Sequence, residues 1–206
     1  VPAKISVDGK KHVRVKMRLK GDWSDHYNTD KKISFRIKTK DSNAILGMRA
    51  MSIQHPKTRG YGLEWIYLQH LKHEGVLAPR YDFVKVIFNG EDWGVYALEE
   101  HFSKELPESM DRREGVMLRF DETDFFVWSS QGKAALLNPA FTALEIDTFR
   151  RGKVYNKETL SSQYKTASKM IQKLVDNKVD PSEIFKIKPV SKFLAISELW
   201  DASHGF

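Results

Sequence analysis

Lysine and arginine alternate with other residues in two short segments near the start of the chain. The cations concerned are Arg14, Lys16, Arg18 and Lys20 in the first segment and Lys32, Arg36 and Lys38 in the second. A period of two residues predicts a β-strand with one apolar and one exposed side. Cations opposite one another on a sheet repel each other, and a bound phosphate would satisfy several at once. The pattern is therefore typical of a phosphate-binding face or of a solvated strand face, and both alternatives stay open.

Three carboxylates stand where a catalytic domain could use them. Glu64 lies early in a helix predicted from Leu63 to Leu71, and it is either a surface carboxylate or the partner of a lysine on the basic strands. In protein kinases such a Lys–Glu pair fixes the lysine that contacts the nucleotide phosphates. Glu100 leaves a predicted strand, either as a plain strand exit or as a connector that touches a nucleotide base.

Asp201 is the third carboxylate and directly follows a predicted amphipathic helix whose first turn holds Pro189. Loop carboxylates beside a helix end are common catalytic bases, although an ordinary polar helix end is the simpler alternative. His70 and His73 are three residues apart on a helix face, but no carboxylate follows at a metal-ligand spacing. They are interpreted as structural histidines, and no metal ligand is assigned.

Composition limits the class of protein. The 206 residues contain no cysteine, which excludes disulfides and thiolate chemistry and fits the cytosol, the periplasm or the cell exterior. Residues 1–40 hold 12 Lys and Arg against 4 Asp and Glu, whereas the rest of the chain is nearly neutral. No apolar run approaches the ~18 residues that span a bilayer. Because the chain opens with Val1 rather than Met, we interpret it as a processed or excised piece of unknown localisation, compatible with a secreted or cell-surface protein whose leader is removed.

The predicted elements are β-rich first and helical later, which indicates an α+β fold. Strands are expected at residues 13–19, 33–37, 82–88, 93–98 and 116–120, with a tight turn at Asn89 and Gly90. Helices are expected from Leu63 to Leu71, closed by Gly75, from an N-cap at Asn156 to about Asn177, and from Pro189 to Trp200. Residues 142–149 fit a helix or a strand.

Several motifs along the chain resemble the spore coat protein H (CotH) kinase family. The most specific is Val84-Lys-Val-Ile-Phe-Asn-Gly-Glu-Asp-Trp-Gly-Val-Tyr96. It is supported by Met17-Arg-Leu-Lys-Gly-Asp-Trp23, Lys31-Lys-Ile-Ser-Phe-Arg-Ile-Lys38, Leu71-Lys-His-Glu-Gly-Val-Leu-Ala-Pro-Arg80, Gly115-Val-Met-Leu-Arg119 and Phe193-Leu-Ala-Ile-Ser-Glu-Leu-Trp-Asp201. Residues 121–188 carry no such likeness.

The resemblance implies an atypical protein-kinase-like fold, with a β-rich N-terminal lobe at residues 1–100 and part of a helical C-terminal lobe at residues 101–206. It implies ATP and Mg²⁺ or Mn²⁺ as ligands, and a protein Ser/Thr hydroxyl as phosphate acceptor. On this likeness the phosphate contacts are Lys20, Lys32, Arg36 and Lys38. Lys38 is the first choice for the kinase lysine, Glu64 for its partner, Glu100 for the nucleotide base and Asp201 for the catalytic Asp.

The family pattern also has a second, metal-binding Asp beyond the stretch that ends at Asp201, and this sequence ends at Phe206 before reaching it. We therefore expect weak or absent transfer by the 206 residues alone. The alternative function is a non-catalytic cell-surface or spore-coat module for adhesion or assembly, which would use the basic face and aromatics such as Trp23 and Trp128. Nucleic-acid binding through the basic strands is the weakest alternative.

Overall fold

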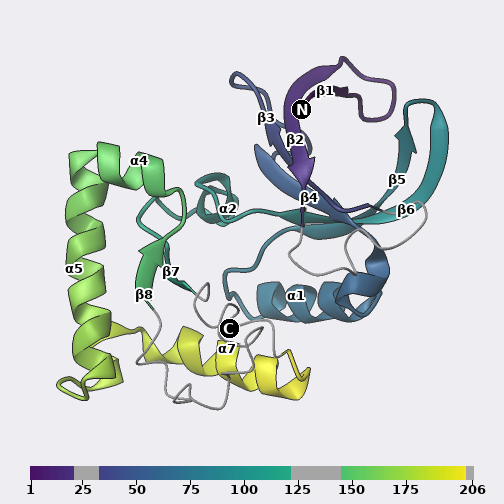
Figure 1. Cartoon of the computed structure of the whole chain (residues 1–206). Helices are drawn as coiled ribbons and strands as arrows, with labels where there is room; N and C mark the ends of the chain where they lie inside the picture. Colours follow the sequence, from purple (N-terminus) through teal and green to yellow (C-terminus); the bar gives the residue numbers. More distant parts are fainter. Residues whose placement is uncertain (21–32, 122–144, 203–206) are drawn as a thin grey trace, which may run out of the picture. The chain divides into compact units, whose positions relative to one another are not determined.

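The computed structural model describes residues 1–20, 33–121 and 145–202. The chain divides into two compact units (Figure 1). Unit 1 contains Val1–Arg113 and Lys188–Phe206, and unit 2 contains Glu114–Ile187. The division of the chain into kinase-like lobes at residues 1–100 and 101–206 stays a prediction.

Unit 1 is built on a six-stranded antiparallel sheet that curls strongly (Figure 1). Its strands lie in the order β1-β2-β3-β4-β6-β5. Their bounds are β1 Pro2–Ile5, β2 Val13–Leu19, β3 Phe35–Thr39, β4 Ala50–Gln54, β5 Tyr81–Phe88 and β6 Glu91–Glu100. Neighbours in sequence pair throughout, except that β6 lies between β4 and β5.

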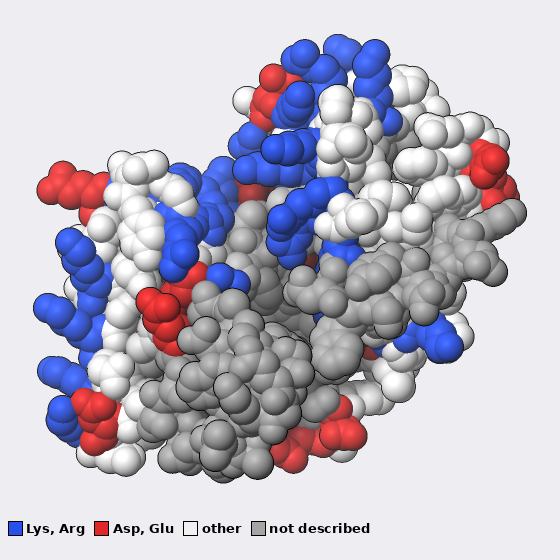
Figure 2. All heavy atoms as spheres, in the orientation of Figure 1, with Lys and Arg blue, Asp and Glu red and all other residues white. Residues whose placement is uncertain are grey.

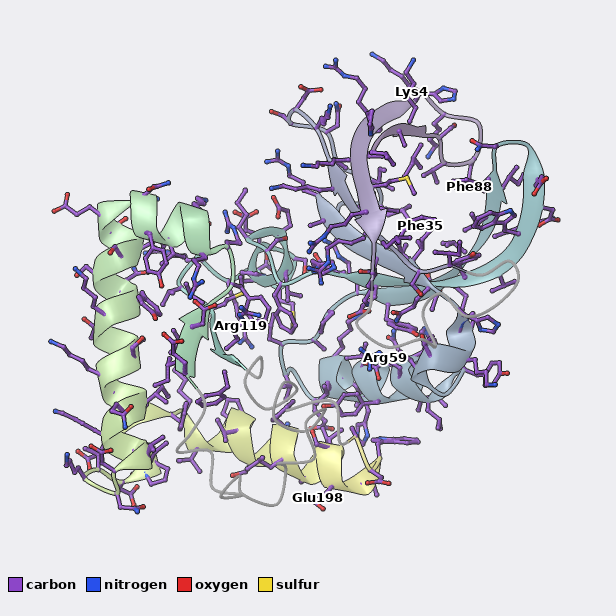
Figure 3. All side chains as sticks on the ribbon, viewed as in Figure 1. Lys4, Phe35, Arg59, Phe88, Arg119 and Glu198 are labelled. Carbon is purple, nitrogen blue, oxygen red and sulfur yellow. The ribbon has the colours of Figure 1, made fainter. Side chains whose placement is uncertain are left out.

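The main hydrophobic core fills the inside of the curl. Val15, Met17 and Ile37 point into it from β2 and β3, as the two-residue alternation predicts. Phe35 and Phe88 stack inside the curl with ring centroids 5.7 Å apart (Figure 3). Because these positions alternate with the cations, the inside is apolar and the outer side of β2 and β3 is basic.

Unit 1 also contains η2 Pro56–Arg59, α1 Leu63–His73, α2 Glu105–Glu108 and α7 Ile187–Leu199. Of these helices, α1 and α7 build a second core against Tyr81 of β5 and Ala97 of β6. Tyr67 of α1 and Ser197 of α7 share a buried hydrogen bond of 2.9 Å. Trp200, just past α7, donates from Nε1 to Nδ1 of His70 at 3.0 Å, which gives His70 a structural partner.

Unit 2 pairs two short strands with helices. Its elements are β7 Leu118–Asp121, β8 Glu145–Thr148, α4 Arg151–Asn156, α5 Glu158–Val175 and α6 Pro181–Ile184. Asp147 of β8 is buried, and its carboxylate accepts hydrogen bonds from Arg119 of β7 and Arg151 of α4. This ion-paired carboxylate ties the strand pair to the first helix.

Most of the expected elements are confirmed, and the α+β class is correct. The turn at Asn89 and Gly90 has φ angles of 52° and 87°, and Gly75 follows α1 with φ 72°. The ambiguous segment ends in a strand, β8. The expected N-cap at Asn156 is wrong, because Asn156 is the last residue of α4 and Lys157 precedes α5. No helix in the described part of the chain is long and apolar enough to cross a membrane.

Like charges face one another across the outer side of β1, β2 and β3. The register places Lys4 opposite Arg14, Lys16 opposite Lys38, and Arg18 opposite Arg36. Figure 2 shows lysine and arginine gathered over these strands of unit 1. Like charges directly opposite on a sheet destabilise it by up to about 1 kcal/mol per pair. The basic side is therefore maintained against a cost in stability.

Replacing Lys38 by Thr should stabilise the protein. The substitution removes one charge of an opposed pair and introduces a residue that favours strands, so we expect a gain of about 0.5 kcal/mol in the free energy of unfolding at low salt. Urea denaturation would measure it, and the gain should shrink at high salt. Lys40→Thr, which changes an exposed lysine just after β3, is the matched control. A loss of stability in Lys38→Thr alone would contradict the repulsion argument.

Candidate functional site

A buried ion pair stands at the end of the basic strand β2. Lys20 Nζ lies 2.5 Å from Oε2 of Glu99 on β6 and 2.8 Å from Oε1 of Gln54 on β4. Gln54 Nε2 also donates to Glu99 Oε2 at 3.1 Å, which closes a triangle of three side chains. Only 11% of the Lys20 side chain is exposed, so the ammonium is largely withdrawn from water.

Strand register brings these three residues together. Residues directly opposite one another share a side of the sheet, so Arg18, Arg36, Ser52, Glu99 and Tyr81 form one row across five strands. Lys20 and Gln54 belong to the next row, because the Lys20 amide pairs with Ser34 and Gln54 lies opposite Ala97. The triangle is therefore fixed by pairing between strands up to 79 positions apart in sequence.

Positive charge exceeds negative charge around the pair. The pKa of Glu99 is lowered although burial opposes ionisation, because Lys20, Arg59 and His101 favour the carboxylate. The pKa of Lys20 is also lowered, mainly by burial, with Arg59 and Arg36 adding repulsion. A simple pair would raise the lysine pKa while it lowered that of the acid. Both shifts point the same way because burial of the Lys20 ammonium outweighs the attraction of Glu99, and Arg59 and Arg36 add to the lowering. A bound anion would offset the positive charge of these neighbouring cations.

Arg59, the last residue of η2, contributes to the positive charge around the Lys20–Glu99 pair. It lies between β4 and α1 (Figure 3) and is half-buried. No hydrogen bond or ion pair holds its guanidinium among the described residues. A guanidinium presents donors in a fixed fork that matches phosphate oxygens. Arg59 therefore joins Lys20, Arg18 and Arg36 as a candidate phosphate contact that the sequence patterns missed.

His101 is a neutral, half-buried neighbour of the cluster. Its Nε2 lies 2.8 Å from Oγ of Ser52. Burial, together with Arg36, lowers the pKa of His101 to about 4, so the ring is uncharged at neutral pH. It borders the cluster without adding a further full charge.

Glu64 lies beside two phenols. Its charge raises the pKa values of Tyr67 and Tyr81, behind burial, which is the larger cause, and the pKa of Tyr81 reaches about 12. Lys38 is exposed on β3 opposite Lys16. The ion pair that the structure shows at the basic strands joins Lys20 to Glu99 of β6. The expected pairing of Lys38 with Glu64 stays a prediction.

Glu100 points to the other side of β6, toward the core. Its fully buried carboxylate accepts from Arg80 Nε at 2.8 Å and Nη2 at 2.6 Å. Arg80 also donates to the main-chain oxygens of Leu46 and Gly47 in the β3–β4 turn. This bidentate pair fastens the end of β6 to that turn. The prediction that Glu100 touches a nucleotide base stays open.

Asp201 occupies a backbone position that usually belongs to glycine. The amide of Ala202 bonds to the oxygen of Ser197, and the amide of Asp201 to that of Glu198, which is the Schellman pattern that ends α7. Asp201 has φ 47° at the left-handed position of this motif, and its side chain is exposed. Left-handed backbone costs a non-glycine residue about 1 kcal/mol or more. Strain of this kind is concentrated at functional sites.

The structure thus brings together some of the expected residues. Lys20 and Arg36 lie near Glu99, while Lys32 falls outside the described residues. Glu99, Gln54 and Arg59 were not expected. Glu99 is next to Glu100 in the sequence. Only the alternation of sides along a strand, followed from the cations of β2 and β3, could have shown which of the two glutamates faces the basic side. Among residues 1–20, 33–121 and 145–202, no group of three His, Asp or Glu side chains is placed to hold a metal ion.

The stability of the protein should fall when the pH drops from about 6.5 to 4. The pKa of His101 is about 4 in the folded chain and 6.5 unfolded, so the unfolded chain binds more protons in this window. The loss should be about 3 kcal/mol. Urea denaturation across pH 4–7 would measure it, with His101→Gln as the reference. A parallel decline in the variant would show that other groups cause the loss.

Removing either partner of the Lys20–Glu99 pair should be costly. Lys20→Met leaves a buried carboxylate without its cation, and we expect a loss of about 3 kcal/mol in the free energy of unfolding. Adding Glu99→Gln to Lys20→Met should recover part of that loss. A double-mutant cycle by urea denaturation would give the coupling energy, and a value under about 0.5 kcal/mol would mean that the two side chains are independent.

The comparison with protein families gives one match. A family model described as CotH kinase protein matches residues 17–193, which is well over half of the chain. The matched span includes Lys20, Gln54, Arg59 and Glu99 and ends before Asp201. No curated protein matches the sequence.

Proposed function

This chain belongs to the CotH kinase protein family, and we propose that it is the domain of an atypical protein kinase that moves the γ-phosphoryl group of ATP to a protein Ser or Thr hydroxyl. The observation that carries the proposal is the buried Lys20–Glu99 pair within an excess of positive charge. In protein kinases a Lys–Glu ion pair holds the lysine that contacts the nucleotide phosphates. In this chain Glu99 would hold Lys20, and Glu99 lies on a strand.

The triphosphate would be held by cations of one side of the sheet. Lys20 is fixed by Glu99 and Gln54, so its ammonium is already oriented before ATP arrives. Arg59, Arg36 and Arg18 lie near it and offer further donors. Charge-assisted hydrogen bonds to phosphate are roughly twice as strong as neutral ones, and burial strengthens them further. This arrangement supports ATP rather than an uncharged ligand.

Asp201 is the proposed base for the acceptor hydroxyl. In the transfer, the hydroxyl oxygen forms a bond to the γ-phosphorus while the bond between that phosphorus and the β,γ-bridging oxygen breaks, which releases ADP. The hydroxyl proton passes to the Asp201 carboxylate. Asp201 is exposed and held at a fixed helix end, so an incoming hydroxyl can reach it.

Mg²⁺ or Mn²⁺ is expected from the family, where a divalent ion neutralises the phosphates. The part of the chain that the structure describes gathers no cluster of three metal-binding side chains. We therefore assign no metal ligand and derive no step through a metal.

A non-catalytic surface module is the second candidate. The opposed like charges on β1 to β3 favour it, because a face kept at a cost in stability suits a binding role. The two functions differ in what Asp201 does. A binding module does not require a proton acceptor at this position.

Nucleotide binding should depend on Lys20 more than on Lys38. A ligand at about 100 times its dissociation constant stabilises a protein by about 2.7 kcal/mol. We expect ATP with Mn²⁺ to raise the melting temperature of the wild type and of Lys38→Met, and to leave Lys20→Met nearly unshifted relative to its own apo value. Equal shifts in all three would move the phosphate site elsewhere, and no shift in the wild type would contradict ATP binding by this chain.

Substitutions at Asp201 should separate catalysis from stability. Asn tolerates left-handed backbone, so Asp201→Asn should fold normally, bind ATP and lose at least about 100-fold of the transfer rate. Asp201→Gly should lose the same activity while gaining about 1 kcal/mol of stability. Phosphate incorporation into a Ser/Thr acceptor and urea denaturation are the readouts. Full activity of Asp201→Asn would remove the residue from the mechanism.

A further inference from the structure

We propose that the outer side of β1, β2 and β3 is a docking surface for an acidic polypeptide segment. This basic face is formed by Lys4, Arg14, Lys16, Arg18, Arg36 and Lys38. Arg18 and Arg36 are also proposed as phosphate donors beside Lys20, but Lys4, Lys16 and Lys38 are not, so docking on this face does not depend on the proposed phosphotransfer.

The basic face has a regular spacing. Lys16 and Arg18 are two residues apart on β2, and Lys38 and Arg36 are their partners on β3. Two residues of a strand span about 6.8 Å, and every second side chain of an extended peptide repeats at the same distance. An extended segment with an acidic residue at every second position would therefore meet successive cation pairs in register. Each carboxylate could lie between two cations that otherwise repel each other.

Charges on the basic face are mostly uncompensated. Arg14 pairs with Asp41 at 2.8 Å, and both side chains are largely exposed. Within the described ranges, Lys16, Arg18 and Lys38 form no ion pair. Figure 2 shows the resulting accumulation of positive charge over these strands, and Figure 3 shows Lys4 directed away from the inside of the curl. An acidic partner would gain attraction here and would also relieve the repulsion within the sheet.

Polypeptide fits this face better than nucleic acid. Proteins that bind single strands stack bases on aromatic side chains. The outward residues of β1, β2 and β3 are charged, apart from Pro2 at the edge. The aromatic residues of this part of the sheet, such as Phe35, pack inside the curl instead. Duplex readers place a helix or a β-ribbon in a groove, and the curled sheet presents its basic side as a broad surface.

The basic face is separate from the Lys20 cluster. Lys20 is largely buried and tied to Glu99 and Gln54, whereas Lys16 and Lys38 are exposed. Exposed charges act over a distance that salt shortens to about 10 Å at 0.1 M, whereas buried ones are screened much less. Acidic-peptide binding should therefore weaken with salt and should persist in the Lys20→Met variant.

Fluorescence anisotropy with a labelled peptide of alternating Glu and Ser, about 16 residues long, would test the proposal on the full chain at low salt. Lys16→Glu combined with Lys38→Glu should weaken binding by about tenfold or more, because repulsion replaces attraction. The matched control is Lys165→Glu combined with Lys169→Glu on α5, which changes the net charge equally at exposed positions. The control should change the affinity by less than about twofold.

Three outcomes would overturn the proposal. No binding of the acidic peptide by the wild type would remove the docking role. Equal weakening in both double variants would show attraction by net charge alone. Equal or tighter binding of an oligothymidylate of the same length would assign the face to nucleic acid instead. Circular dichroism of each double variant would establish that the sheet is intact, and the milder pair Lys16→Gln and Lys38→Gln would replace a variant that fails to fold.

Discussion

The Glu99 carboxylate imposes the strongest constraint on unit 1, because a charge that is withdrawn from water has to be matched by opposite charge and hydrogen bonds. Lys20 and Gln54 supply both, and they come from two other strands of the sheet. The ends of β2, β4 and β6 must therefore stay aligned. Since Arg59 and Arg36 add further positive charge, the arrangement that stabilises Glu99 also leaves the cluster attractive to an anion.

Strand alternation gives the neighbouring carboxylates Glu99 and Glu100 separate roles. Glu99 faces the basic side and meets Lys20, while Glu100 faces the core and meets Arg80. The Arg80 pair reaches the turn at Leu46 and Gly47, so it holds the β3–β4 connection on which the position of β4 depends. The Arg80–Glu100 pair is therefore an anchor for the sheet, and the Lys20–Glu99 pair is the one proposed to meet a ligand. Adjacent residues of the same type can differ in this way wherever a strand is covered on both sides.

Local patterns were enough to predict the strands around Val15 and Ile37, the turn at Asn89 and helix α1, because each depends on a short period or on a glycine at a fixed position. Predicting the residues of the site required knowledge of which strands pair. β4 is mostly buried on both sides and carries no alternation, so neither the strand nor Gln54 stood out. The pairing of Lys20 with Glu99 depends on long-range register, which no short window contains. The misplaced cap at Asn156 arose because a short helix, α4, ends where a favourable capping residue stands.

Lys20 and the exposed lysines of the basic face differ in how far water surrounds them. This difference determines which anions each can distinguish. Lys20 is desolvated and oriented by Gln54 and Glu99, so an anion there must meet fixed geometry and replaces little water. Lys16 and Lys38 are hydrated and free to reorient, so they select for charge and spacing rather than for shape. A compact polyphosphate suits the first environment and an extended acidic chain the second. The two environments should therefore also differ in their response to salt, which is strong for the exposed lysines and weak for Lys20.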